Sequence, residues 1–164
     1  MPTNYLKKYN QLLELLYSNP FDNVKSIKAV FDRDFNGNYT IKFYSKNIEP
    51  TPSDSEDKIE RLFNHLTRVV TDEKTKKREF ESERAIRIHW IKHHLEKHLS
   101  LPNVLTFKVE DENRVYLLDK SERYIIVLEP LRNGDAFYLL SAYKLLPSNY
   151  KKIMRKYEKR SQPI

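Results

Sequence analysis

The sequence contains no cysteine among its 164 residues. This absence excludes disulfide bonds, thiolate zinc sites and cysteine nucleophiles. Any chemistry must therefore come from histidine, carboxylate, hydroxyl, lysine, arginine or tyrosine groups.

Long apolar runs are absent as well. No segment approaches the roughly 18 consecutive apolar residues that a membrane-spanning helix requires. The start of the chain, MPTNYLKKYN, lacks the apolar region of a signal peptide. We therefore expect a cytoplasmic protein with no membrane partner.

The length and composition favour one domain with an ionic surface. A chain of this length can bury a substantial core, and 39% of its residues are hydrophobic and 12% aromatic. A further 32% are charged, so much of the surface must be ionic. We expect disorder only in short stretches.

Positive charge dominates and is concentrated near the C-terminal end. The net charge is +7, and residues 144–164 hold seven cations against Glu158, a balance of +6. Clustered cations are typical of surfaces that bind phosphate backbones with salt-dependent affinity. A basic helix that is merely solvated is the alternative interpretation. The cations of this helix that we expect to bind RNA are Lys151, Lys152, Arg155 and Lys156.

The N-terminal part predicts a helix followed by a β-hairpin. Apolar residues recur at helical spacing over residues 4–18, ahead of Asn19-Pro20. Apolar residues then alternate over residues 27–35 and 39–43, which predicts two strands. We expect a three-residue loop, 36–38, because a two-residue turn would divide the apolar side chains between both faces.

A proline-containing acidic segment, residues 47–57, predicts a linker. It would separate an N-terminal extension, residues 1–46, from a core over residues 58–164. Ser53 and Glu56 resemble a capping box for the first helix of this core.

The core predicts further helices and a meander of strands. The apolar stripe of its first helix runs to Val70, and another helix is expected from about Ser82 to His98. After the strands, Ser148 is expected to cap a basic final helix. The predicted fold class is α+β: an antiparallel four-stranded sheet packed with helices, plus the N-terminal helix and β-hairpin. The strands are expected at residues 105–109, 115–117, 124–128 and 137–143.

Histidines are concentrated in the predicted helix that ends near His98. Members of this group four residues apart share a helix face, which is also a spacing of zinc-binding histidines. The glutamate of the HExxH motif is missing, and no cysteine can complete a site. We therefore predict no metal and no cofactor, and surface histidines are the common alternative. The group consists of His89, His93, His94 and His98.

The same predicted helix combines titratable groups with permanent cations. Cleavage of RNA by its own 2′-hydroxyl requires a base, an acid and cations that stabilise the phosphorane charge. Packing is the alternative, with Trp90 in the core and Arg87 paired with Glu83. The groups that could act on RNA lie within about three helical turns: Arg84, Arg87, His89, Lys92 and His93.

Hydroxyl and aromatic side chains occur on the predicted strands. Ser141 and Tyr143 alternate with Phe137 and Leu139, so one face of the last strand is expected to start in the core and end in hydroxyls. That arrangement suits an active site at the end of a sheet, although a small residue and a buried tyrosine can also serve packing alone. Neighbouring strands interleave groups that could stack unpaired bases, namely Tyr116, Arg123, Tyr124 and Tyr138.

Two strings in this part of the chain resemble a known family. Residues 78–92 read REFESERAIRIHWIK, and residues 137–143 read FYLLSAY ahead of the basic helix. Over roughly residues 78–160, the pattern resembles the phage- and prophage-borne branch of the superfamily that groups barnase, EndoU, colicin nucleases and RelE. The chain departs from the pattern at His93-His94, where a proline-containing helix break is expected.

The resemblance implies a small antiparallel sheet packed on helices and RNA cleavage without a metal. Members commonly act as toxins or phage effectors, which implies the cytoplasm of a bacterial host and a protein inhibitor or antitoxin as a partner. The positions carried over from the matching strings are Arg87, His89, Lys92, Ser141 and Tyr143.

Our first hypothesis is therefore a metal-independent endoribonuclease. His89 would act as base or acid, Arg87 and Lys92 would hold phosphate, and Ser141 or Tyr143 would orient the RNA or donate a proton. The second hypothesis is a non-catalytic nucleic-acid-binding protein that uses the C-terminal helix. The third is a phage structural or host-interaction protein that uses the N-terminal helix and hairpin. The preferred RNA and the oligomeric state stay open.

Overall fold

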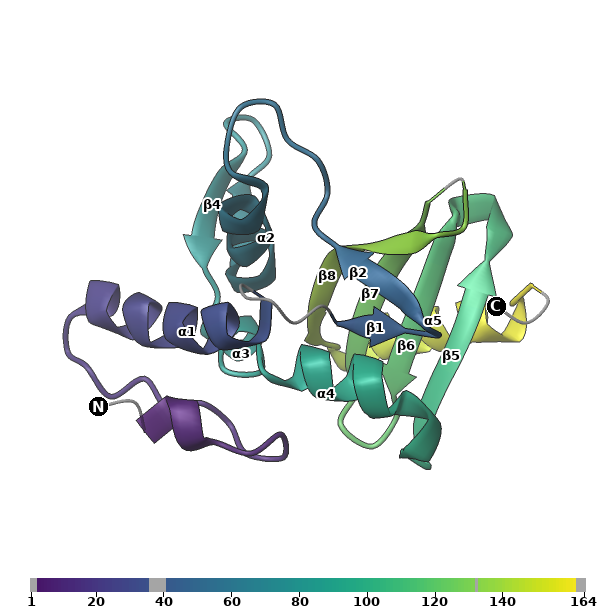
Figure 1. The fold of residues 1–164 in the computed structure, drawn as a ribbon, viewed down its shortest axis with the longest axis horizontal. Helices are drawn as coiled ribbons and strands as arrows, with labels where there is room; N and C mark the ends of the chain where they lie inside the picture. Colours follow the sequence, from purple (N-terminus) through teal and green to yellow (C-terminus); the bar gives the residue numbers. More distant parts are fainter. Residues whose placement is uncertain (1–2, 36–40, 132, 162–164) are drawn as a thin grey trace.

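The structure, a computed structural model, describes residues 3–35, 41–131 and 133–161. It is an α+β protein in which helices pack on a curled six-stranded sheet, with a separate two-stranded hairpin beside it (Figure 1). No helix of the described residues is both long and apolar enough to cross a membrane. The helices are η1 (Thr3–Leu6), α1 (Pro20–Phe35), α2 (Lys58–Thr67), α3 (Ser82–Ala85), α4 (Trp90–Lys97), η2 (His98–Ser100), η3 (Glu110–Glu112) and α5 (Pro147–Glu158).

The predicted meander is present, but it is part of a larger sheet. The strand order is β1-β2-β8-β7-β6-β5, in which β5 to β8 are antiparallel neighbours and β2 runs parallel to β8. The prediction of a four-stranded antiparallel sheet is therefore wrong for the sheet as a whole. No local sequence pattern predicts a short strand that pairs with a strand far along the chain. The strands are β1 (Lys42–Phe43), β2 (Lys46–Glu49), β3 (Arg68–Asp72), β4 (Lys77–Phe80), β5 (Val104–Val109), β6 (Arg114–Asp119), β7 (Tyr124–Pro130) and β8 (Ala136–Lys144).

The N-terminal helix and β-hairpin were predicted wrongly. Residues 7–19 form no regular helix, and α1 occupies the place of the first predicted strand. The reason is Asn19, whose side-chain oxygen accepts a hydrogen bond from the Phe21 N–H at 2.9 Å, while Pro20 takes the first helical position. These residues start a helix instead of ending one. The side chains that α1 buries recur at helical spacing: Ile27, Val30, Phe31 and Asp34.

The strand β1 lies within the second predicted strand but pairs with β2. The turn between them contains Tyr44 and Ser45, which have positive φ angles of 50° and 66°, as a type I′ hairpin turn requires. The predicted loop 36–38 lies outside the described residues. Residues 47–49 of the predicted linker belong to β2 and pair with β8. The division into extension, linker and core stays a prediction.

The helices of the core begin and end at other residues than predicted. Asp57 caps α2 by accepting hydrogen bonds from the N–H groups of Ile59 and Glu60, at 2.8 and 3.2 Å. The end of the predicted apolar stripe belongs to β3. The helix predicted from Ser82 to His98 is divided into α3 and α4 by turns at residues 86–89.

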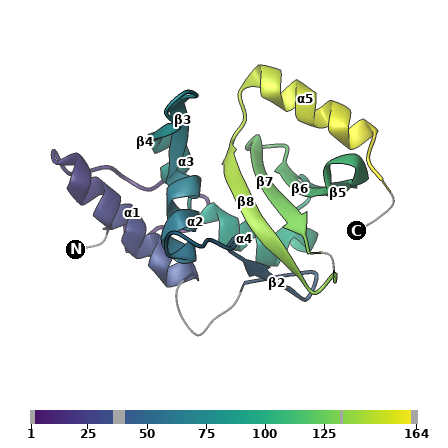
Figure 2. The same cartoon turned by 90° about the horizontal axis from the view of Figure 1, so that it is seen from above.

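Side chains form two hydrophobic clusters on opposite faces of the large sheet. The larger cluster joins α1, α2 and α4 to the sheet and includes Phe31, Leu66 and Trp90. The smaller cluster, which includes Phe107 and Ile153, lies beneath α5. Figures 1 and 2 show α4 and α5 on opposite sides of the sheet. The sheet therefore has an α4 side and an α5 side.

A buried ion pair fixes α4 to β6. The Nε2 of His94 lies 2.8 Å from Oδ2 of Asp119, and Nδ1 lies 2.8 Å from the backbone oxygen of Trp90. Both partners can accept hydrogen bonds, so both ring nitrogens of His94 are placed to donate. Burial alone would raise the pKa of Asp119, but hydrogen bonds from His94, Ser121 and a backbone N–H lower it to about 2.

Candidate functional site

An irregularity in β8 decides which way its hydroxyl side chains face. In the pairing with β7, Val127 lies opposite Ser141, but the next residue of β7 lies opposite Leu139. Leu140 is therefore an extra residue, which is a β-bulge. A bulge reverses the faces of all later residues in the strand.

The bulge places Ser141 and Tyr143 on the α5 side of the sheet. Phe137, Leu139 and Ala142 lie in the larger cluster, whereas Tyr143 packs against the smaller one. Ser141, adjacent to Ala142, faces the same way as Tyr143. The expectation that the hydroxyls continue the face of Phe137 and Leu139 is wrong. Both hydroxyl residues are partly exposed.

Arg84 of α3 lies against the end of β8. Its guanidinium carbon is 4.9 Å from the centre of the Tyr143 ring, and its Nη1 donates to the backbone oxygen of His65 at 3.3 Å. Its Nε is buried and has no hydrogen-bond partner among the described residues. The nearby carboxylate of Glu81 accepts hydrogen bonds from backbone N–H groups at the start of α3. No ion pair in the described part of the chain includes Arg84.

Arg84 lies among other cations and is partly shielded from solvent. Burial lowers the pKa of Arg84, which means that its charge is poorly solvated. Burial also lowers the pKa of His65 on α2, and the charges of Arg78, Arg61 and Arg84 lower it further. The His65 imidazole is therefore neutral at pH 7 and can accept a proton. This end of β8 combines cations, a neutral imidazole and a phenol.

Further cations flank the same end of the sheet. Arg123 lies over the ring of Tyr150, 5.0 Å from its centre, and its backbone oxygen accepts a hydrogen bond from Leu145 N–H at 2.7 Å. The next residue, Tyr124, begins β7 and pairs with Lys144, which is adjacent to Tyr143 in β8. Arg123 is therefore at the Tyr143 end of β8.

The basic helix α5 follows directly. It begins with Pro147 at its first position, so the prediction that Ser148 caps it is wrong. Of the four cations predicted to bind RNA, Lys156 forms an ion pair with Glu112. The other three, Lys151, Lys152 and Arg155, are exposed.

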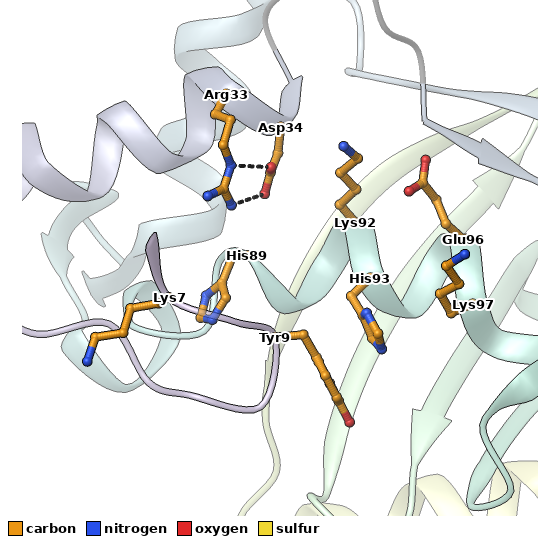
Figure 3. A pocket seen from close by; sticks show the side chains of 9 residues that line it. All are labelled: Lys7, Tyr9, Arg33, Asp34, His89, Lys92, His93, Glu96 and Lys97. Carbon is orange, nitrogen blue, oxygen red and sulfur yellow. Dashed lines mark hydrogen bonds and ion pairs between the residues drawn. The ribbon is translucent and has the colours of Figure 1, made fainter. Parts of the chain in front are cut away.

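Two of the predicted catalytic residues, His89 and Lys92, lie on the α4 side of the sheet. They line a cavity of about 250 Å³ between α4, α1 and the N-terminal segment (Figure 3). The Nε2 of His89 donates to the backbone oxygens of Lys8 and Gln11, at 3.0 and 2.7 Å, and Nδ1 is buried without a partner in the described part of the chain. Burial lowers the pKa of His89. The cavity is lined by Lys7, Tyr9, Arg33, Asp34, His89, Lys92, His93, Glu96 and Lys97.

Arg87, predicted to hold phosphate, is buried and already bonded. Its Nη1 donates to the backbone oxygen of Glu83 at 2.6 Å and to the side chain of Glu83 at 3.0 Å. Its guanidinium carbon lies 5.4 Å from the centre of the Trp90 ring. These contacts are those of the packing alternative.

The aromatic side chains predicted to stack bases do not lie together in the structure. Tyr124 is fully buried, and its hydroxyl donates to the backbone oxygen of Arg87 at 3.4 Å. Tyr116 is buried beneath α5 and donates to Glu112 at 2.6 Å. Tyr138 is the member of the set that is partly exposed on the sheet.

The structure thus brings together two residues that the sequence had singled out, Arg84 and Tyr143, with others that it had not. Arg84 was predicted as a group that could act on RNA, because it lies within three helical turns of other cations and histidines. Arg78 is the first residue of the same string, on β4, whereas His65 comes from α2, outside any motif, so no local signal could have found His65. The predicted catalytic set is divided by the sheet: His89 and Lys92 lie on one side, Ser141 and Tyr143 on the other.

The fold and this site define an α+β protein with a cationic, hydroxyl-bearing sheet face. Within the described ranges, no group of three or more histidine, aspartate or glutamate side chains could hold a metal ion. No protein-family model, no curated protein and no solved structure matches this chain. The site is therefore interpreted from its own geometry.

Proposed function

We propose that this protein is a metal-independent endoribonuclease, of the toxin or phage effector type, that acts in the cytoplasm of a bacterial host. The observation that supports this most is Arg84, a partly buried cation that forms no ion pair in the described chain and lies on Tyr143. A poorly solvated cation attracts an incoming anion strongly, because the local dielectric constant is low. Its planar guanidinium suits a phosphate oxygen.

The proposed reaction is attack by a 2′-hydroxyl on the adjacent phosphorus. The 2′-oxygen forms a bond to phosphorus as the bond to the 5′-oxygen breaks, which yields a 2′,3′-cyclic phosphate and a 5′-hydroxyl. Neutral His65 takes the 2′-hydroxyl proton, and the phenol of Tyr143 gives a proton to the 5′-oxygen. Arg84 stabilises the phosphorane charge.

This assignment moves the base from His89 to His65. His89 lies on the other side of the sheet, and its Nε2 is used by two backbone oxygens. Ser141 lies on the same face as Tyr143 and is assigned to orient the RNA. Arg123 and the exposed cations of α5 hold neighbouring phosphates, so binding should weaken with salt.

The exposed cations of α5 also support a second candidate, a non-catalytic RNA-binding protein. The two functions differ in whether Arg84 and Tyr143 are needed for a chemical step. A role in which the N-terminal segment meets a protein partner would require neither RNA cleavage nor RNA binding.

Incubation with labelled tRNA and total RNA in EDTA tests the proposal. We expect fragments that end in cyclic phosphate, and a cleavage rate that falls about 100- to 1000-fold in Arg84→Ala because a cation at the developing charge is lost. His65→Gln and Tyr143→Phe should also slow cleavage. Lys25→Ala, which removes an exposed cation of α1, is the matched control and should cleave at the wild-type rate.

The other outcomes separate the alternatives. Intact RNA that binds in a salt-dependent manner would contradict the nuclease and favour the binding protein. Intact RNA without binding would favour a protein partner. Cleavage that survives Arg84→Ala would show that the site has been misplaced.

A further inference from the structure

A second cavity lies at the other end of the α5 side of the sheet. Its volume is about 560 Å³, which is within the usual size range of pockets for small organic groups. It is bounded by the turns that follow β5 and β7. The residues that line it are Asn113, Glu129, Pro130, Leu131, Asn133 and Tyr138.

The cavity and the proposed catalytic residues share one face and one strand. Tyr138 lies between Phe137 and Leu139, both in the α4-side cluster, so its side chain is on the α5 side. Tyr143 is on that side as well, five residues further along β8. At about 3.3 Å per residue, the two positions are roughly 16 Å apart. A strand of RNA held at Arg84 and Tyr143 would need only a few nucleotides to reach Tyr138.

The ring of Tyr138 is available for stacking. Within the described chain it stacks on no other aromatic ring, and its hydroxyl has no hydrogen-bond partner. It thereby differs from Tyr116 and Tyr124, whose hydroxyls are bonded and whose rings are buried. An aromatic face that is partly exposed beside a cavity suits the flat face of a base.

Polar groups at the rim match the edge of a base. One oxygen of Glu129 accepts a hydrogen bond from Arg114 at 3.0 Å, and the other has no partner among the described residues. The side-chain oxygen of Asn133 accepts a hydrogen bond from the Asp135 N–H at 3.1 Å, and its amide hydrogens donate to no residue that the structure describes. Asn113 adds a second amide. Carboxylate and amide groups can bond to the donors and acceptors of an unpaired base.

We infer that this cavity binds one nucleobase of single-stranded RNA, a few nucleotides from the phosphodiester held at Arg84. The inference rests on the proposed function, because it takes RNA as the ligand. It adds a substrate class: the RNA must be unpaired at this position, since a paired base can offer neither its face nor its edge.

Binding of a 2′-O-methyl RNA of about 12 nucleotides tests the inference, because such RNA spans a typical binding site and lacks the 2′-hydroxyl needed for cleavage. A fluorescent label at one end reports the affinity. One abasic position is moved along the strand, and each RNA is measured with wild-type protein and with Tyr138→Ala. Tyr17→Ala, which removes a tyrosine that is 45% exposed in the N-terminal segment, is the control.

Stacking of a base on an aromatic ring predicts about a tenfold loss of affinity in Tyr138→Ala with intact RNA, and no loss in Tyr17→Ala. The affinity of wild-type protein should fall by a similar factor when the abasic position is the one that occupies the cavity. The affinity of the Tyr138→Ala variant should be the same for this abasic RNA as for the intact RNA. Tyr138→Phe keeps the ring and should bind as the wild type does. Asn133→Ala changes an exposed side chain, so this variant should fold as the wild type does. Its affinity for the intact RNA should fall roughly threefold.

Two results would overturn the inference: unchanged affinity in both Tyr138→Ala and Asn133→Ala, or abasic losses that add to the Tyr138→Ala loss at every position. The test separates this inference from the proposed function. RNA cleavage that depends on Arg84 but shows no Tyr138 effect would defeat the cavity alone. Tyr138-dependent binding without cleavage of natural RNA would support the cavity and defeat catalysis alone.

Discussion

The two sides of the central sheet hold their polar residues differently. On the α4 side, His94 donates from both ring nitrogens and Nε2 of His89 donates to two backbone oxygens, while Nδ1 of His89 and Nε2 of His93 and His98 are buried without a partner among the described residues. On the α5 side, Arg84 and Tyr138 have polar groups without partners in the described chain. Most of the histidines that lie together in the sequence are therefore buried inside the protein. The groups available to a ligand come from separate elements.

The largest effect on stability is expected for His94→Ala. The change leaves the buried Asp119 carboxylate without its hydrogen-bonded partner His94, which costs about 3–5 kcal/mol. Denaturant unfolding at pH 7 measures the loss. His93→Ala removes a partly exposed histidine stacked on Tyr9 and should cost less than about 1.5 kcal/mol. Equal losses in the two variants would contradict the importance of the ion pair.

His89→Ala should destabilise the protein by about 1–2 kcal/mol. The backbone oxygens of Lys8 and Gln11 each lose one donor, although the Gln11 N–H and the Trp90 Nε1–H still donate to them. The rate of RNA cleavage per folded molecule should stay the same, since His89 lies on the α4 side. Unfolding curves and cleavage assays in EDTA measure the two quantities. A folded His89→Ala variant that cleaves no RNA would place the active site on the α4 side. It would contradict the proposed difference between the two sides of the sheet.

Acid should weaken the α4 side through Asp119. Its pKa is about 2 in the folded protein against an ordinary value of 3.8, so the unfolded chain binds this proton more readily. The associated stability, about 2 kcal/mol, is complete above pH 5 and is lost as the pH falls from 4 towards 2. Urea unfolding of wild type and Asp119→Asn at several pH values measures this. The difference between the two proteins should shrink by that amount at low pH, and a constant difference would contradict the assignment.

The parts of the fold that were predicted correctly have strong local patterns. The strands β5 to β8 alternate or are apolar throughout, and short polar turns join them. The failure at α1 has a local reason too. Ile27 and Phe31 fit an alternating pattern and a helical one equally well, and the cap at Asn19 favours the helix. The pairing of β2 with β8 joins distant residues, so nothing in its neighbourhood predicts it.

The candidate site was predictable only in part. Ser141 and Tyr143 were found as neighbours on one strand, but their face was not, because the bulge at Leu140 has no signature in the sequence. The segment around Arg84 was found by its resemblance to a family. His65 was overlooked because four other histidines lie together elsewhere in the chain.

By itself, the sequence determined what depends on composition and on neighbours along the chain. These properties are the positive charge, the absence of thiol chemistry, the meander and the basic final helix. Only the tertiary structure decided which polar groups are bonded and which are available. Arg84, His65 and Tyr143 come from three elements, and one inserted residue reverses the face of a strand.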